Sequence, residues 1–115
     1  MVEYHDPDDI ALDATLAALA DPTRRAILAQ LGEGEKRITE IAEPFDASLN
    51  AISKHIKKLE AAGLVRRRRA GRDHFLSVDP APINKIAAWF EAQRAFWNSR
   101  LDRLEALMRK EQNNE

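Results

Sequence analysis

The chain has 115 residues, of which 44% are hydrophobic and 32% charged, and its formal net charge is −1. This length fits one domain, and this apolar content excludes a chain that is mainly disordered. The chain has no cysteine, which excludes disulfides, thiolate metal ligands and cysteine nucleophiles. No apolar run approaches the roughly 18–20 residues that span a bilayer, and the acidic N-terminus is unlike a secretory signal. We therefore expect a cytoplasmic protein with no membrane partner.

Residues 8–20 place apolar side chains at the three- and four-residue spacing of an α-helix. They are Ile10, Leu12, Leu16 and Leu19. Asp21 and Pro22 are typical of a helix start, because Asp accepts hydrogen bonds from free N–H groups and proline lacks one. We expect this second helix to end near Leu31 and to expose Arg24 and Arg25. It should bury three apolar residues, namely Ile27, Leu28 and Leu31.

Two further helices are expected between Gly34 and Gly63. Thr39 is the predicted N-cap of a short helix that Pro44 limits. Asp46 is expected in a left-handed conformation within the tight turn that follows. Ser48 then caps a longer helix that ends near Ala62. Its inward face should hold Ile52, Ile56 and Leu59, with His55 at the edge of that face.

Two short strands, 65–69 and 74–78, are predicted on either side of Gly71. Their core contacts should be Val65, Leu76 and Val78. The Asp-Pro-Ala-Pro run at 79–82 breaks the chain, and a last helix is expected over 82–108. The predicted fold is mainly α with a small β-hairpin, in the order ααααββα. Two helices joined by a short turn and followed by a hairpin form a winged helix-turn-helix.

The basic residues concentrate in this motif. Residues 46–78 hold eight basic and three acidic residues, a net charge of +5. Such a local excess indicates a site for a polyanion, although the whole chain is nearly neutral. Short polar side chains at the start of the 48–62 helix can reach base edges in a major groove about 12 Å wide. The wing arginines can reach phosphates or a minor groove.

The predicted DNA-binding residues lie at two helix starts, on the outer face of the 48–62 helix, and on the hairpin. They are Thr39, Ser48, Leu49, Asn50, Ser53, Lys54, His55, Lys57, Arg68, Arg69 and Arg72. The alternative for residues 66–69 is a solvated strand face with a few ion pairs. The alternative for Lys57 and Lys58 is an ordinary exposed helix surface.

The last helix carries more apolar surface than a chain of 13.0 kDa can cover, which favours a partner helix. We expect a symmetric homodimer in which the 48–62 helix of each copy is the reading helix, the one that enters the major groove. The two reading helices should lie about 34 Å apart. Packing within a single chain is the alternative. The expected interface residues come from 8–20 and from 82–110. They are Leu12, Leu16, Ile86, Trp89, Phe90, Phe96, Trp97, Leu101 and Leu104.

The stretch from Leu19 to Pro82 resembles the ArsR family of winged-helix transcriptional regulators. Three segments show the resemblance: LADPTRRAILAQL at 19–31, ITEIAEPFDASLNAISKHIKKLEAAGLVRRRR at 38–69 and GRDHFLSVDPAPI at 71–83. The continuation WFEAQRAFWNSRLDRLEAL at 89–107 is similar to the dimer helix of a cysteine-free subgroup. The resemblance implies a homodimeric operator-binding protein, usually a repressor released by a signal. It also implies a DNA-binding domain over 5–100, with a helix-turn-helix at 38–62 and a wing at 64–78.

The chain departs from the metal-sensing members of that family. Their paired cysteines on the third helix correspond here to Arg37 and Thr39, and residues 82–109 contain no histidine. We therefore expect no metal and no cofactor, and the effector stays open. The N-terminal group of His5, Asp6, Asp8 and Asp9 is expected to be a solvated terminus rather than a cation site.

The predicted function is that of a sequence-specific regulator of transcription that binds double-stranded DNA, most simply a homodimeric repressor on an inverted-repeat operator. No catalytic residue is expected, because the chain lacks a phosphate-binding loop, a nucleophile elbow and a zinc-hydrolase motif. The alternative is a winged-helix module that binds proteins and not DNA. It would leave Asn50, Ser53 and the basic wing without a role. Strong salt dependence of DNA binding would favour the regulator.

Overall fold

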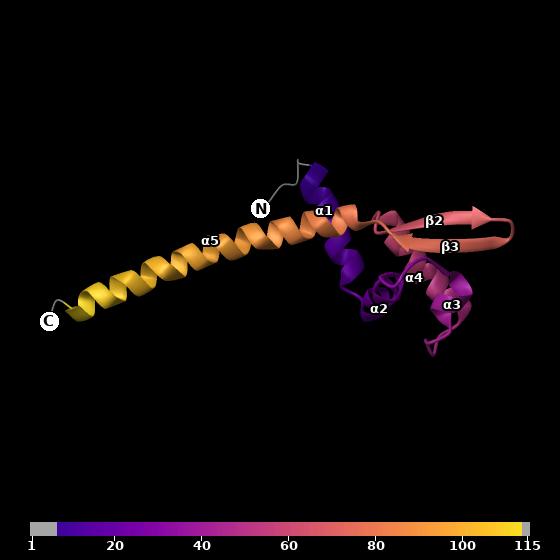
Figure 1. Cartoon of the computed structure of the whole chain (residues 1–115), viewed down its shortest axis with the longest axis horizontal. Coiled ribbons are helices and arrows are strands. Elements are labelled where there is room, and N and C mark those ends of the chain that lie inside the picture. The colour runs from indigo at the N-terminus through magenta and orange to yellow at the C-terminus, as the bar shows by residue number, and fades with distance from the viewer. Residues whose placement is uncertain (1–6, 114–115) are drawn as a thin grey trace. The chain divides into compact units, whose positions relative to one another are not determined.

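The computed structural model describes residues 7–113, with side chains from residue 9 onward. It contains five helices and three strands within that range (Figure 1). In chain order they are α1 (Pro7–Leu19), α2 (Pro22–Leu31), β1 (Lys36–Arg37), α3 (Ile38–Ala42), α4 (Leu49–Ala61), β2 (Val65–Ala70), β3 (Asp73–Val78) and α5 (Pro80–Asn113). The predicted mainly helical fold with a small antiparallel sheet is confirmed. The chain divides into two compact units, residues 1–84 and 85–115, which are described separately.

Helix α2 starts as predicted, but Arg24 is less exposed than predicted. The Asp21 carboxylate accepts a hydrogen bond of 3.0 Å from the backbone N–H of Arg24, and Pro22 opens the helix. The prediction that Arg24 is exposed is wrong, because its side chain is half-buried. Its guanidinium donates to the carbonyl oxygens of Ala18 (2.6 Å) and Ala17 (3.1 Å). The last carbonyls of a helix lack partners within it, so a nearby cation binds them.

The short helix α3 begins two residues earlier than predicted. Its N-cap is Arg37, so the assignment of Thr39 as N-cap is wrong. The backbone N–H of Arg37 donates to Oε1 of Glu40 at 3.2 Å, an interaction that stabilises the helix start from within. The left-handed conformation predicted for Asp46 is also wrong, because the described residues with positive φ are all glycines. The link over 43–48 is long enough to turn the chain without such a residue.

Helix α4 begins and ends as its sequence predicts. The Ser48 hydroxyl accepts a hydrogen bond of 3.1 Å from the backbone N–H of Ala51. At the other end Gly63 adopts φ +76°, and the backbone N–H of Leu64 donates to the Leu59 carbonyl at 3.0 Å. This pattern is a Schellman cap, which requires a left-handed residue and therefore favours glycine.

The sheet has one more strand than the predicted hairpin. Its order is β1-β3-β2, and both pairings are antiparallel. Strands β2 and β3 pair from Val65↔Val78 to Ala70↔Asp73, which leaves Gly71 and Arg72 as the turn. Gly71 has φ +64°, as the first position of a tight hairpin turn requires. Strand β1 has only two residues, too few to show an alternating pattern.

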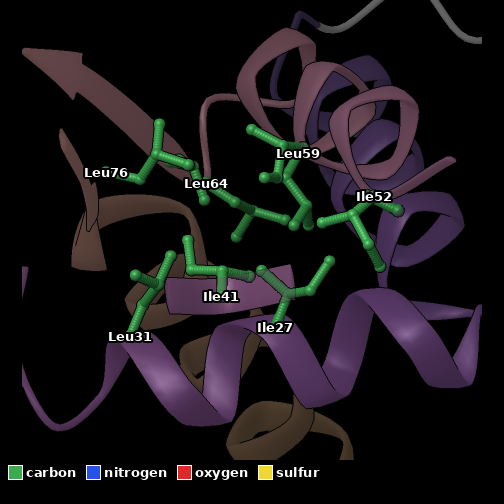
Figure 2. Packing of buried hydrophobic residues seen from close by; sticks show 10 residues of the cluster. Ile27, Leu31, Ile41, Ile52, Leu59, Leu64 and Leu76 are labelled. Carbon is green, nitrogen blue, oxygen red and sulfur yellow. The ribbon is translucent and has the colours of Figure 1, made fainter. Parts of the chain in front are cut away.

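The core of the first unit lies among α2, α3, α4 and the base of the sheet (Figure 2). The largest fully buried side chains are Ile27, Ile41, Ile52, Ile56, Leu59, Leu64 and Leu76. The buried face predicted for α4 is therefore confirmed. Val65 is buried as well, while Leu28 and Val78 are partly buried and pack against the cluster. This core holds α4 with its opposite face toward solvent.

Helix α5 is longer than predicted at both ends, with 34 residues. It begins at Pro80, because the Asp79 carboxylate accepts a hydrogen bond of 3.1 Å from the backbone N–H of Ala81. Pro80 and Pro82 are tolerated there, since the first N–H groups of a helix have no partner within it. From Lys85 onward, Ile86 is the buried residue of the described helix.

Candidate nucleic-acid interface

Three of the predicted DNA-binding side chains, Asn50, Lys54 and Lys57, lie on the face of α4 opposite its buried residues. Ser53 borders the buried face, and Leu49 lies in line with Ile56 at the start of the helix. Asn50, Lys54 and Lys57 are exposed, Leu49 is 50% exposed, and Ser53 is half-buried. Within residues 9–113 neither lysine forms an ion pair, so both ammonium groups face solvent. A helix with short polar groups near its start and cations further along can bind base edges and phosphates together.

The two hydroxyl residues predicted at helix starts, Ser48 and Thr39, differ in their surroundings. The Ser48 hydroxyl is occupied as the cap of Ala51, so its side chain already has a partner. Thr39 is exposed on α3, but it lies inside that helix and not at its cap. Thr39 therefore does not present a helix start to phosphate, and its exposed hydroxyl is the group that could make a contact.

His55 lies at the edge of the buried face, as predicted. Its side chain is 28% exposed, and its Nδ1 lies 3.5 Å from Nη1 of Arg24 and 3.6 Å from Oδ2 of Asp21. The pKa of Asp21 is lowered, first by the hydrogen bond from the backbone N–H of Arg24 and further by the charges of His55 and Arg24. His55 thus connects the reading helix to the start of α2.

The structure separates the wing arginines into two groups. Three of them form ion pairs with acids from three different parts of the first unit: Arg66 with Asp79 (3.1 Å), Arg67 with Glu60 (2.6 Å) and Arg68 with Glu35 (2.6 Å). Among the described residues, Arg69 and Arg72 have no ion-pair partner. The cations of Arg69 and Arg72, near the tip of the hairpin, are therefore available to a ligand. The alternative that residues 66–69 form ion pairs on a solvated strand holds for the other three arginines.

Phe75 organises the outer face of the sheet. The guanidinium of Arg68 lies 4.6 Å from its ring centre and that of Arg37 lies 5.4 Å from it. These three residues are neighbours across the strands, since Phe75 pairs with both Arg37 and Arg68. The hydrogen bond between Glu35 and Arg68 lowers the pKa of the carboxyl and raises that of the guanidinium. The contact between Arg68 and DNA stays a prediction. Such a contact would require Arg68 to leave Glu35.

Sequence reasoning missed the acidic partners of the wing. Glu60 lies on α4 and Glu35 precedes β1, seven and 33 residues from the arginines they bind. No local spacing rule relates residues across a helix end, a turn and a strand, so only the fold brings these charges together.

The expected interface residues differ in exposure. On α1, Leu12 and Leu16 are half-buried. On α5, Ile86 is only 8% exposed, which leaves it less available to a partner than predicted. From Trp89 onward, the large apolar side chains of α5 are 42–62% exposed. They are Trp89, Phe90, Phe96, Trp97, Leu101, Leu104, Leu107 and Met108.

Two further observations concern other kinds of site. Among the residues with described side chains, no group of three or more His, Asp or Glu could hold a metal ion. The side chains of His5, Asp6 and Asp8 lie outside that part of the chain. Within residues 7–113, none of the helices is apolar over a length sufficient to cross a bilayer.

Comparison with known proteins agrees with this architecture. A family model described as a helix-turn-helix domain matches residues 19–68. The HTH-type transcriptional regulator Rv2034 of Mycobacterium tuberculosis is 37% identical over 83 residues, which cover 72% of this chain and 73% of that protein. A crystal structure of an ArsR family transcriptional regulator is 36% identical and superposes with a TM-score of 0.75 over 86% of this chain and 98% of that one.

The chain belongs to the ArsR family. Another relative, the transcriptional repressor SdpR of Bacillus subtilis, is 33% identical over 72 residues, or 63% of this chain and 80% of SdpR. The matched region of this ArsR-family protein spans α2, α3 and α4 and continues into β2. The chain is therefore a DNA-binding transcriptional regulator, and the comparisons lend no support to a winged-helix module that binds only proteins.

Proposed function

We propose that this ArsR-family regulator is a homodimeric repressor that binds an inverted-repeat operator with one α4 helix in each of two successive major grooves. The observation that carries the proposal is the exposed polar face of α4, held opposite a fully buried apolar face. Repression is supported by the relative SdpR, which is a transcriptional repressor. A dimer whose helices lie about 34 Å apart matches one turn of B-DNA.

We assign the contacts of each protomer by side-chain chemistry. Asn50 and Ser53 bind base edges, and Leu49 packs against apolar base atoms. Six residues bind the phosphate backbone or help to orient the helix on it: Thr39, Ser48, Lys54, His55, Lys57 and Arg68. Arg69 and Arg72 reach the DNA beside the groove that α4 occupies, because their charges are not neutralised by acids of the described chain.

The proposed dimer forms through α5 with support from α1. At about 1.5 Å per residue, the 34 residues of α5 extend for about 50 Å. The eight half-exposed apolar side chains on this helix form a larger apolar surface than a monomer usually leaves in water. A two-fold axis lets the same face of each copy cover the other, and Leu12 and Leu16 of α1 then extend the contact.

The test is selection of bound fragments from genomic DNA, followed by footprinting of the full-length protein on the selected sequence. We expect an inverted repeat with half-sites 10 to 11 base pairs apart, about one helical turn. Protection should fall on two major grooves, and transcription from the adjacent promoter should drop when the protein is present. Selected sites without two-fold symmetry, or no selection at all, would contradict the proposal.

A further inference from the structure

Arg67 connects the reading helix to the wing. It lies on β2, on the same face of the strand as the buried Val65, and its side chain is only 21% exposed. Its Nε and Nη2 donate to the two carboxylate oxygens of Glu60 at 3.2 and 2.6 Å. Glu60 belongs to the last turn of α4, so this two-point contact joins the helix directly to the hairpin.

The third donor of the same guanidinium reaches His74 on β3. Nη1 of Arg67 lies 3.0 Å from Nδ1 of His74. Because arginine is always a donor, Nδ1 must accept, which requires a neutral imidazole with its proton on Nε2. One arginine therefore binds α4, β2 and β3 together, and its planar fork leaves little freedom in the angle between them.

Arg67 is poorly placed to bind DNA itself. Its donors are occupied on three sides, and the bond to Glu60 raises the pKa of its guanidinium further. The side chains of Arg66 and Arg68 are 70% and 57% exposed, so their ion pairs exchange with water more readily. Arg69 and Arg72 lie further along the hairpin. Arg69 is opposite His74 in the pairing of β2 with β3, and Arg72 is in the turn.

We propose that Arg67, held by Glu60 and His74, is a positioning residue that fixes the angle of the wing against the reading helix. It thereby lets Arg69 and Arg72 reach the DNA while α4 lies in the major groove. The inference rests on the proposed function, because it assumes that these two arginines bind the duplex.

The sign of one substitution separates positioning from simple electrostatics. Glu60→Ala removes a negative charge close to the DNA-binding surface and frees a cation, so charge alone would strengthen binding. Positioning requires the opposite result, because the wing loses its attachment to α4. Glu35→Ala is the matched control, since it removes the same charge from the exposed pair with Arg68 and leaves the contact between Glu60 and Arg67 intact.

The experiment measures affinity, salt dependence and hydroxyl-radical footprints of the full-length protein on its selected operator. If Arg69 and Arg72 each neutralise one phosphate per protomer, the double variant Arg69→Ala/Arg72→Ala lowers the slope of log K against log salt by about 3.6 per dimer. We expect Glu60→Ala to give most of that loss together with loss of protection beside the major groove, and Glu35→Ala to give neither. Arg67→Met should behave like Glu60→Ala, whereas Arg66→Met, with the same change in charge, should keep the wing footprint.

Combining the substitutions gives the decisive comparison. In the Glu60→Ala background, Arg69→Ala/Arg72→Ala should weaken binding less than twofold further, because the wing is already displaced. Full additivity of the two losses would overturn the positioning role. If Arg69→Ala/Arg72→Ala has no effect when Glu60 is present, the assignment of Arg69 and Arg72 to DNA binding is wrong. This result differs from additivity, so the experiment distinguishes an error in the proposed function from an error in the positioning role.

A second readout covers the case in which a variant unfolds. Nitrogen NMR of the His74 ring in the unaltered protein should show the Nε2–H form, and Arg67→Lys, which keeps the charge but not the fork, should shift it toward the mixture of a free imidazole. An Nδ1–H ring in the unaltered protein would contradict the contact on which the proposal depends.

Discussion

Trp97→Glu tests the proposed dimer most directly. Trp97 is 60% exposed, and a buried aromatic side chain covers about 150–250 Å². A partner that covers the exposed 60% of Trp97 would therefore bury about 90–150 Å² of this side chain in each protomer. At about 25 cal/mol per Å², this area is worth about 2–4 kcal/mol per protomer, before the added burial of a charge. Loss of both copies should raise the dimer dissociation constant by roughly 10³–10⁵-fold.

Sedimentation velocity over a range of protein concentrations measures this change. We expect the unaltered protein to sediment as a dimer at micromolar concentration and Trp97→Glu as a monomer with unchanged helix content. Ser99→Glu is the matched control, because Ser99 is equally part of the exposed helix but lies about 200° around it from Trp97. A dimeric Trp97→Glu variant, or equal dissociation by Ser99→Glu, would refute the assignment of this face.

Three further predictions concern the first unit. Asn50→Ala should relax preference at particular base pairs, costing about 1–3 kcal/mol there, whereas Arg69→Ala should weaken all sequences alike; binding titrations on single-base operator variants check this. Leu59→Ala should lower the free energy of unfolding by about 2–5 kcal/mol in urea titrations, because Leu59 is fully buried. Asp21→Ala should lower the melting temperature at neutral pH. Since the folded pKa of Asp21 lies below its ordinary value, this contribution is present above pH 4 and should disappear as pH falls through the folded pKa. A difference in melting temperature that persists in strong acid would exclude the capping carboxylate as its cause.

Several elements of the fold follow from short stretches of sequence. Ser48 marks the start of α4 and Gly63 its end, because a capping hydroxyl and a left-handed residue act within one helical turn. The predicted burial of Ile52, Ile56 and Leu59 follows from helical periodicity alone. The polar face of α4, with Asn50, Lys54 and Lys57, follows from the same periodicity.

Other features depend on residues that are distant in the chain. Arg37 caps α3 where Thr39 was predicted, and the two-residue strand β1 holds Arg37 beside Phe75. The four consecutive arginines have the same chemistry in the sequence, yet alternation of the strand directs them to opposite faces of the sheet. Each of the first three then meets a different acid, and Arg69 meets none in the described chain.

The sequence by itself determined where α2 begins, where α4 begins and ends, which face of α4 is buried and where the positive charge concentrates, because caps and periodicity act over a few residues. The tertiary structure decided which cations are neutralised and which stay available to DNA. An ion pair depends on distance in space, and Glu60 comes within 2.6 Å of Arg67 only after α4 and the hairpin have packed on a common core.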